Sequence, residues 1–152
     1  MHESVKTFVP ELVEFFDKLK PSDLNRLSDF YTSDVFFKDP FNEVSGTSAI
    51  KVIFQHMFDT LELPQFVVTT KLFDADQAFI TWDFLFALKS SPGNVFTVKG
   101  SSHLLFDADL TGSIKIKYHR DYWDPAEDIY EKIPGLGVLI RWIKRKASAT
   151  QK

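Results

Sequence analysis

In the first 64 residues, apolar side chains recur every three or four positions, with charged residues between them. This spacing is typical of amphipathic helices that bury one face. Pro21 and Pro64 stand where two of these patterns stop, and Gly46 precedes the last of them. The patterns predict helices over residues 5–19, 24–31 and 50–61, and a short strand fits residues 34–38.

From residue 65 the period of the apolar positions changes to two, and β-branched and aromatic residues become frequent. Four such runs follow, at residues 65–73, 78–89, 95–106 and 113–123. Clusters of Asp, Ser, Pro, Gly and Asn separate the runs, which is typical of turns. The second half of the chain therefore predicts a four-stranded antiparallel meander.

The last run has an ambiguous register. Residues 114–117 alternate between isoleucine and lysine, and His119, Asp121 and Trp123 fall in phase with the lysines. Either this trio faces outward, or a β-bulge near Tyr118 turns it toward the apolar face. We favour the bulge, after which His119 and Asp121 would project to one side and the carboxylate would raise the basicity of the imidazole.

The chain ends in a basic amphipathic segment. A capping box that starts at Asp124 predicts a helix, and its apolar positions continue to Ile143 with a break at Pro134 and Gly135. Cations near the end of the segment favour a helix docked on the domain. One alternative, which we do not favour, is that Trp142 and the cations contact a partner or an anionic membrane surface. The other is that the segment forms a lid over a cavity.

Helices followed by a long meander predict an α+β fold in a single domain over residues 1–152. We expect a cone-shaped, curved antiparallel sheet packed against the N-terminal helices, with an additional C-terminal helix. The chain has 16 Phe, 3 Trp and 4 Tyr, which fits either a thick aromatic core or a large apolar pocket. The candidates for the wall of such a pocket are Phe15, Tyr31, Phe37, Phe54, Met57 and Trp123.

Composition and charge narrow the functional classes. A net charge of −3 argues against a nucleic-acid binder with a basic face. The absence of cysteine excludes disulfides, thiolate catalysis and cysteine-ligated zinc. Early charges at Glu3 and Lys6 argue against a signal peptide, and no apolar stretch has the length of a membrane span, so we expect a cytoplasmic protein.

Three segments resemble the nuclear transport factor 2-like, or SnoaL-like, superfamily. They are residues 36–40 (FFKDP), 46–50 (GTSAI) and 120–124 (RDYWD), together with the meander between them. The superfamily includes ketosteroid isomerase, limonene epoxide hydrolase and polyketide cyclases, and the resemblance covers nearly the whole chain. It implies the cone fold but no single reaction, because this fold hosts many activities and many non-enzymes.

The resemblance to ketosteroid isomerase places Asp39 at the position of the general base. The hydrogen-bond donors that stabilise the dienolate in that enzyme fall at Phe15 and Ser102. Phenylalanine donates no hydrogen bond and serine is a far weaker acid than the protonated aspartate, so steroid isomerisation is not expected.

The resemblance to limonene epoxide hydrolase makes Asp121 and Asp83 the catalytic carboxylates. The arginine that bridges them there is Thr81 here, and the residues that hold the water fall on Phe37 and Asp39. Without the arginine, the two carboxylates lose the cation that keeps them ionised and oriented, so the same reaction is in doubt.

Two further polar residues on the predicted strands have open orientations. Asp83 lies in an apolar run, so its carboxylate either lines a wet cavity or faces solvent or a subunit interface while Trp82 faces the core. His103 faces either Asp83 or solvent. Neither these residues nor His119 show metal-ligand spacing, so we expect no metal and no cofactor.

These observations leave two functions open. The first is a pocket protein for a small apolar molecule, with cofactor-free acid/base chemistry of the epoxide hydrolase, cyclase or isomerase type. In this function Asp83 and Asp121 share a proton, His103 or His119 assists, and Asp39 is an alternative base. The second is a non-catalytic ligand carrier or interaction module whose cone is filled by side chains. We also expect a homodimer through the exposed sheet face, because apolar residues alternate on both faces. The alternative is that the C-terminal helix covers this face.

Overall fold

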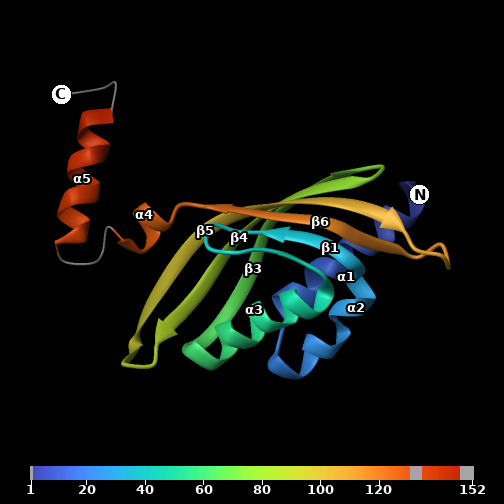
Figure 1. Ribbon diagram of the computed structural model, residues 1–152, viewed down its shortest axis with the longest axis horizontal. Helices are drawn as coiled ribbons and strands as arrows, with labels where there is room; N and C mark the ends of the chain where they lie inside the picture. The colour runs from blue at the N-terminus through green and yellow to red at the C-terminus, as the bar shows by residue number, and fades with distance from the viewer. Residues whose placement is uncertain (1, 131–134, 148–152) are drawn as a thin grey trace.

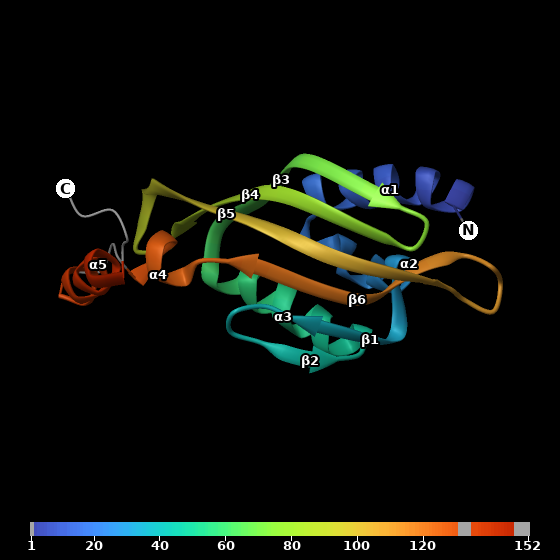
Figure 2. The same ribbon diagram turned by 90° about the horizontal axis from the view of Figure 1, so that it is seen from above.

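The computed structural model describes residues 2–130 and 135–147. A six-stranded curved sheet arches over three N-terminal helices, which lie against its concave face (Figures 1 and 2). The elements, in chain order, are α1 (His2–Asp17), the 3₁₀ helix η1 (Pro21–Arg26), α2 (Leu27–Phe30), β1 (Tyr31–Lys38), β2 (Glu43–Ser45), α3 (Thr47–Thr60), β3 (Leu61–Asp74), β4 (Gln77–Leu88), β5 (Ser91–Ala108), β6 (Ile114–Trp123), α4 (Pro125–Asp128) and α5 (Leu136–Ala147).

The strand order is β2-β1-β6-β5-β4-β3. Strands β3 to β6 form the predicted antiparallel meander, and β2 pairs antiparallel with β1. The pairing of β1 with β6 is parallel, so the sheet is mixed where a wholly antiparallel one was expected. The predicted α+β cone with helices on one face is confirmed.

Two boundaries differ from the sequence pattern. Tyr31 begins β1 and does not end the second helix, because the chain turns extended at that residue and Tyr31 pairs with Ile116 of β6. Pro64 lies inside β3 and does not end the third helix, which stops at Thr60. The strand tolerates this proline because β3 is at the edge of the sheet and its register is irregular there.

The core lies between the helices and the concave face. Phe8 of α1 packs edge-to-face on Phe106 of β5, with ring centroids 5.4 Å apart, and Phe15 of α1 stacks on Phe30 of α2. These contacts fill the cone at the end of the sheet near α1 and α2. Aromatic side chains therefore form a thick core in one part of the domain.

The C-terminal segment starts as predicted. The Asp124 carboxylate accepts hydrogen bonds from the amides of Ala126 and Glu127, which caps α4. Pro134 lies outside the described residues, so the predicted break there is not observed directly. Helix α5 lies beyond the end of the sheet, and the side chains of Leu139 and Trp142 are 51% and 50% exposed.

The expectation that α5 docks on the domain is therefore wrong for the described residues, whose apolar positions stay half exposed. None of the described helices has the length and apolar character needed to cross a membrane.

Candidate functional site

A β-bulge on β6 builds the polar part of the site. Phe106 of β5 lies opposite Ile116 and Leu105 lies opposite Tyr118, which leaves Lys117 as an extra residue on β6. The bulge reverses the phase of the strand, so the residues before and after it face the same side. Ile116 is fully buried, and His119 beyond the bulge is only 4% exposed. The predicted bulge is confirmed.

His119 connects β1 to Asp121. Its Nδ1 lies 2.8 Å from the Tyr31 hydroxyl, and its Nε2 lies 2.7 Å from Oδ1 of Asp121. The rings of Tyr31 and His119 are nearly parallel, and Phe37 packs against the edge of the imidazole. This packing fixes the orientation of the imidazole, and so that of the Nε2 bond to Asp121.

A second chain of hydrogen bonds reaches the same carboxylate oxygen from the other side. The Trp82 indole N–H donates to Ser102 Oγ at 2.9 Å, and the Ser102 hydroxyl donates to Oδ1 of Asp121. Trp82, Ser102 and Asp121 lie on the neighbouring strands β4, β5 and β6, with Ser102 directly opposite Asp121. Two relays therefore converge on Oδ1 of Asp121.

The chemistry of the donors sets the direction of both relays. Burial, followed by the charge of Asp121, raises the pKa of Tyr31 well above its ordinary value, so this phenol keeps its proton. A carboxylate only accepts, so the His119 Nε2 that faces Asp121 is the donor of that bond, while Nδ1 bonds to the Tyr31 hydroxyl. Asp121 thus receives two donors at one oxygen, and a carboxylate can accept both.

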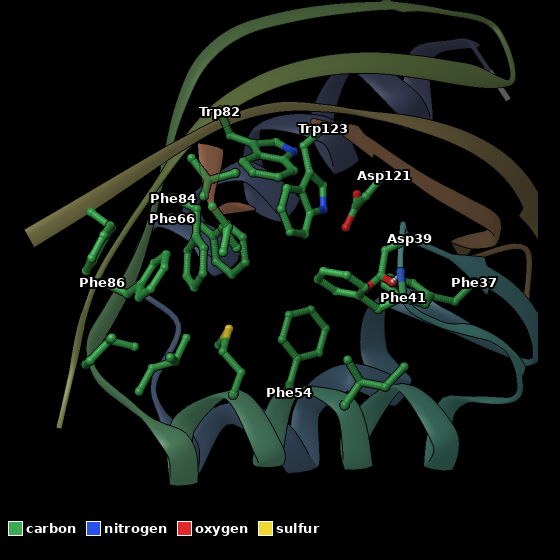
Figure 3. Close-up of a pocket in the computed structure, with 17 residues that line it drawn as sticks. Phe37, Asp39, Phe41, Phe54, Phe66, Trp82, Phe84, Phe86, Asp121 and Trp123 are labelled. Atoms are coloured by element: carbon green, nitrogen blue, oxygen red, sulfur yellow. Dashed lines mark hydrogen bonds between the residues drawn. The ribbon is translucent and has the colours of Figure 1, made fainter. Parts of the chain in front are cut away.

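The Asp121 carboxyl group also lines a cavity of about 560 Å³ between the sheet and α3. Figure 3 shows this carboxyl group beside Trp123, directed into the hollow, with Phe54 on the opposite wall. Its side chain is 17% exposed. Most of the wall is aromatic, and the aromatic lining residues are Phe37, Phe41, Phe54, Phe66, Trp82, Phe84, Phe86, Phe96 and Trp123.

Asp39 is the other charged residue in the wall among the residues that the structure describes. Its Oδ1 accepts hydrogen bonds from the backbone amides of Phe41 and Asn42, and the Asn42 side-chain amide contacts both carboxylate oxygens at 3.1 Å. Asp39 therefore closes the turn between β1 and β2. This structural role explains its position at the cavity wall.

The structure does not bring Asp83 and His103 to this site. Asp83 lies on the convex face of the sheet, 30% exposed, with one oxygen 3.4 Å from Lys99 Nζ. His103 is on the same face, where its Nε2 lies 3.2 Å from the Gln77 side chain. The expectation that Asp83 and Asp121 share a proton is wrong. Adjacent residues of a strand face opposite sides of the sheet, so Trp82 lines the cavity and Asp83 faces away from it.

The predicted wall residues divide in the same way. Phe37, Phe54, Met57 and Trp123 line the cavity. Phe15 does not, because it packs in the core against Phe30. Tyr31 is 1% exposed and acts from behind His119.

Sequence reasoning missed the role of Ser102 and Trp82. The sequence marks Ser102 only as a weak substitute for an acid and Trp82 only as a neighbour of Asp83. Their signal lies in the cross-strand register, which places Ser102 beside Asp121 and Ile80, and which the sequence pattern does not specify. Within the described ranges, no three His, Asp or Glu side chains form a group that could hold a metal ion.

The fold and the site define a cone-shaped protein of the nuclear transport factor 2-like class. Residues 12–114 match the model of the SnoaL-like domain, so the chain belongs to this family. A comparison with curated proteins gave no match.

Solved structures support the same fold at low sequence identity. An NTF2-like protein of unknown function from Burkholderia pseudomallei is 15% identical and has a TM-score of 0.66, with 84% of this chain and 95% of that one covered. AclR from Streptomyces galilaeus is 16% identical, with a TM-score of 0.65 and coverage of 97% and 94%. A protein of ketosteroid isomerase-like fold from Catenulispora acidiphila, solved in complex with trimethylamine, is 16% identical, with a TM-score of 0.65 and coverage of 80% and 88%.

Proposed function

We propose that this protein binds a small, largely apolar molecule in the aromatic cavity and uses Asp121 for acid/base chemistry on it. The observation that carries the proposal is the position of the Asp121 carboxylate, which lines a cavity of about 560 Å³ and is held by two buried relays. Known small-molecule sites combine an apolar wall of this size with a few polar groups in the same way. A filled cone would have favoured an interaction module instead.

The relays suit Asp121 to proton transfer. Ser102 and His119 both bind Oδ1, and among the described residues no hydrogen-bond partner of Oδ2 is found. Oδ2 is thus free to take a proton from one ligand carbon and return it to another, which is an isomerisation. It can also take a proton from a water that attacks an epoxide carbon and pass it to the epoxide oxygen as the ring C–O bond breaks, which gives a diol. His119 is a positioning residue that orients the carboxylate, with Tyr31 behind it.

The cavity also fits a non-catalytic carrier, which is the second candidate. The structural neighbour from Catenulispora acidiphila holds trimethylamine, so a protein of this fold accommodates a small organic molecule. The two candidates differ in what leaves the protein. Mass spectrometry of a bound compound after incubation separates them, since a carrier releases it unchanged and an enzyme releases an isomer, a hydrolysis product or a cyclised product.

A thermal-shift screen of terpenoid, lipidic and polyketide-like compounds tests the binding step. A compound at 100 times its Kd stabilises the folded state by about 2.7 kcal/mol. Met57 on α3 lines the cavity, so Met57→Trp should occupy part of it and abolish the shift. The proposal fails if no compound raises the melting temperature, or if every active compound stabilises the Met57→Trp variant equally.

A further inference from the structure

The aromatic cavity carries negative charge that its own wall does not balance. Asp39 and Asp121 contribute carboxylates to the wall, and no described Lys, Arg or His lines it. Ser102 and His119 both bind Oδ1 of Asp121, and neither contacts Oδ2. A ligand that carries a positive charge would pair with Oδ2 in surroundings shielded from water, where such a pair is stronger than at the surface.

The nearest cations on neighbouring strands are directed elsewhere. Lys38 and Arg120 are paired in register on β1 and β6, and both alternate with residues that face the cavity. Lys38 Nζ lies 3.6 Å from a Glu43 oxygen, and the Arg120 guanidinium lies 4.8 Å over the Tyr122 ring. They line a depression at the rim that shares Asp39, Asp121 and Trp123 with the aromatic cavity, but neither cation lies in the wall of the cavity itself.

The walls themselves favour a cation. The faces of aromatic rings are electronegative, and a desolvated ammonium group gains most from Trp. Trp123 stands beside the Asp121 carboxylate (Figure 3), and Phe41 packs edge-to-face against Trp123 with centroids 5.4 Å apart. A positive group at this point would meet a carboxylate on one side and aromatic rings on the others.

We propose that the ligand of this cavity is an organic cation, namely an alkyl- or aryl-substituted ammonium compound. Its charge lies between Asp121 and Trp123, and its apolar part packs against the wall at Phe84 and Phe86. This inference rests on the proposed function, because it names the chemical class of the molecule that binds in the same cavity. It also gives Asp39 a role at the rim, where its carboxylate attracts a cation entering the cavity.

Two probes of equal shape test the inference on the unaltered protein. Benzyltrimethylammonium and its neutral carbon isostere, neopentylbenzene, differ only in the charged atom. Binding is measured by calorimetry and by thermal shift. We expect the cation to bind at least roughly tenfold more tightly, which corresponds to one desolvated cation–π contact or its equivalent in charge pairing.

Two variants show whether the preference comes from the cavity. Asp121→Asn should bring the affinities of the two probes to within about threefold of each other. Asp83→Asn removes the same charge from the convex face and should leave the preference unchanged. If the neutral probe binds the unaltered protein as tightly as the cation, or if Asp83→Asn has the same effect as Asp121→Asn, the inference is wrong.

The inference and the proposed function fail in different ways. Neutral compounds that bind the cavity while both charged and uncharged benzyl probes do not would overturn the cation inference and leave the proposed function in place. A wider screen in which compounds of every charge fail to bind would overturn both.

Discussion

His119 and Asp121 lie two residues apart on β6, and Nε2 of the imidazole meets Oδ1 of the carboxylate at 2.7 Å. Both face the concave side only because Lys117 is an extra residue in the strand. His119 is buried, and the Tyr31 hydroxyl bonds to the far side of its imidazole. The stability of the domain should therefore depend on His119 more than on any exposed histidine.

His119→Ala tests this dependence. The substitution leaves the Tyr31 hydroxyl without its hydrogen-bond partner and removes one of the two donors to Asp121, and each unsatisfied buried group costs roughly 1–3 kcal/mol. We expect the free energy of unfolding, measured in urea, to fall by at least about 2 kcal/mol. His103→Ala is the matched control on the convex face and should change it by less than ~0.5 kcal/mol. Equal losses would contradict the buried relay.

Tyr31 predicts an alkaline limit to stability. The pKa of Tyr31 is raised in the folded state, so the unfolded state releases the phenol proton more easily. The contribution of Tyr31 to the free energy of unfolding is therefore complete below the ordinary tyrosine pKa of about 10, and it is lost as the pH rises above that value. Tyrosinate absorbance should show one late-titrating phenol. Tyr31→Phe should remove that late step, whereas the exposed Tyr122→Phe should leave it in place.

Gly100 is needed for the position of Trp82. A Cβ at Gly100 would overlap the six-membered ring of Trp82, so Gly100→Ala must displace the indole that supports Ser102. We expect a loss of roughly 1–3 kcal/mol in unfolding free energy, as for overpacked cores, with a change in tryptophan fluorescence. Gly93→Ala meets no atom within 4 Å and is the control. Similar behaviour of the two variants would mean that Trp82 does not pack as described.

The predicted homodimer through the convex face stays a prediction. Leu72, Phe79 and Tyr122 are exposed there, at 67%, 44% and 45%, and burying them in a two-fold interface would remove an apolar patch from water. Light scattering at micromolar concentration should give a dimer mass for the unaltered chain and a monomer mass for Phe79→Lys. Leu110→Lys, in the β5–β6 turn, should remain dimeric. A monomeric unaltered chain would rule the dimer out.

The sequence pattern predicted the elements that depend on local periodicity. The meander, the cap at Asp124 and the bulge that turns His119 inward were all indicated by alternation or by local hydrogen-bonding chemistry. The parallel pairing of β1 with β6 was not, because it joins segments about eighty residues apart and leaves no local mark. The position of α5 likewise depends on tertiary contacts that amphipathicity does not specify.

The site was predicted in part. Asp121 was identified through the family resemblance, and the bulge placed it correctly. Asp83 was misplaced because both faces of β4 are apolar, with Phe79 and Leu85 on one and Phe84 and Phe86 on the other, so alternation alone could not say which face lines the cavity. The Trp82–Ser102 relay needs the register between strands, which only the folded sheet provides.

Occupancy of the aromatic cavity is tested most directly at Met57. The chain has 2 methionines, so a methyl-labelled sample gives separate signals for Met57 on the cavity wall and for Met1 at the N-terminus. A compound that raises the melting temperature should shift the Met57 methyl resonance, show nuclear Overhauser contacts with it and leave Met1 unchanged. Stabilisation by the compound with no change at Met57 would contradict binding in this cavity.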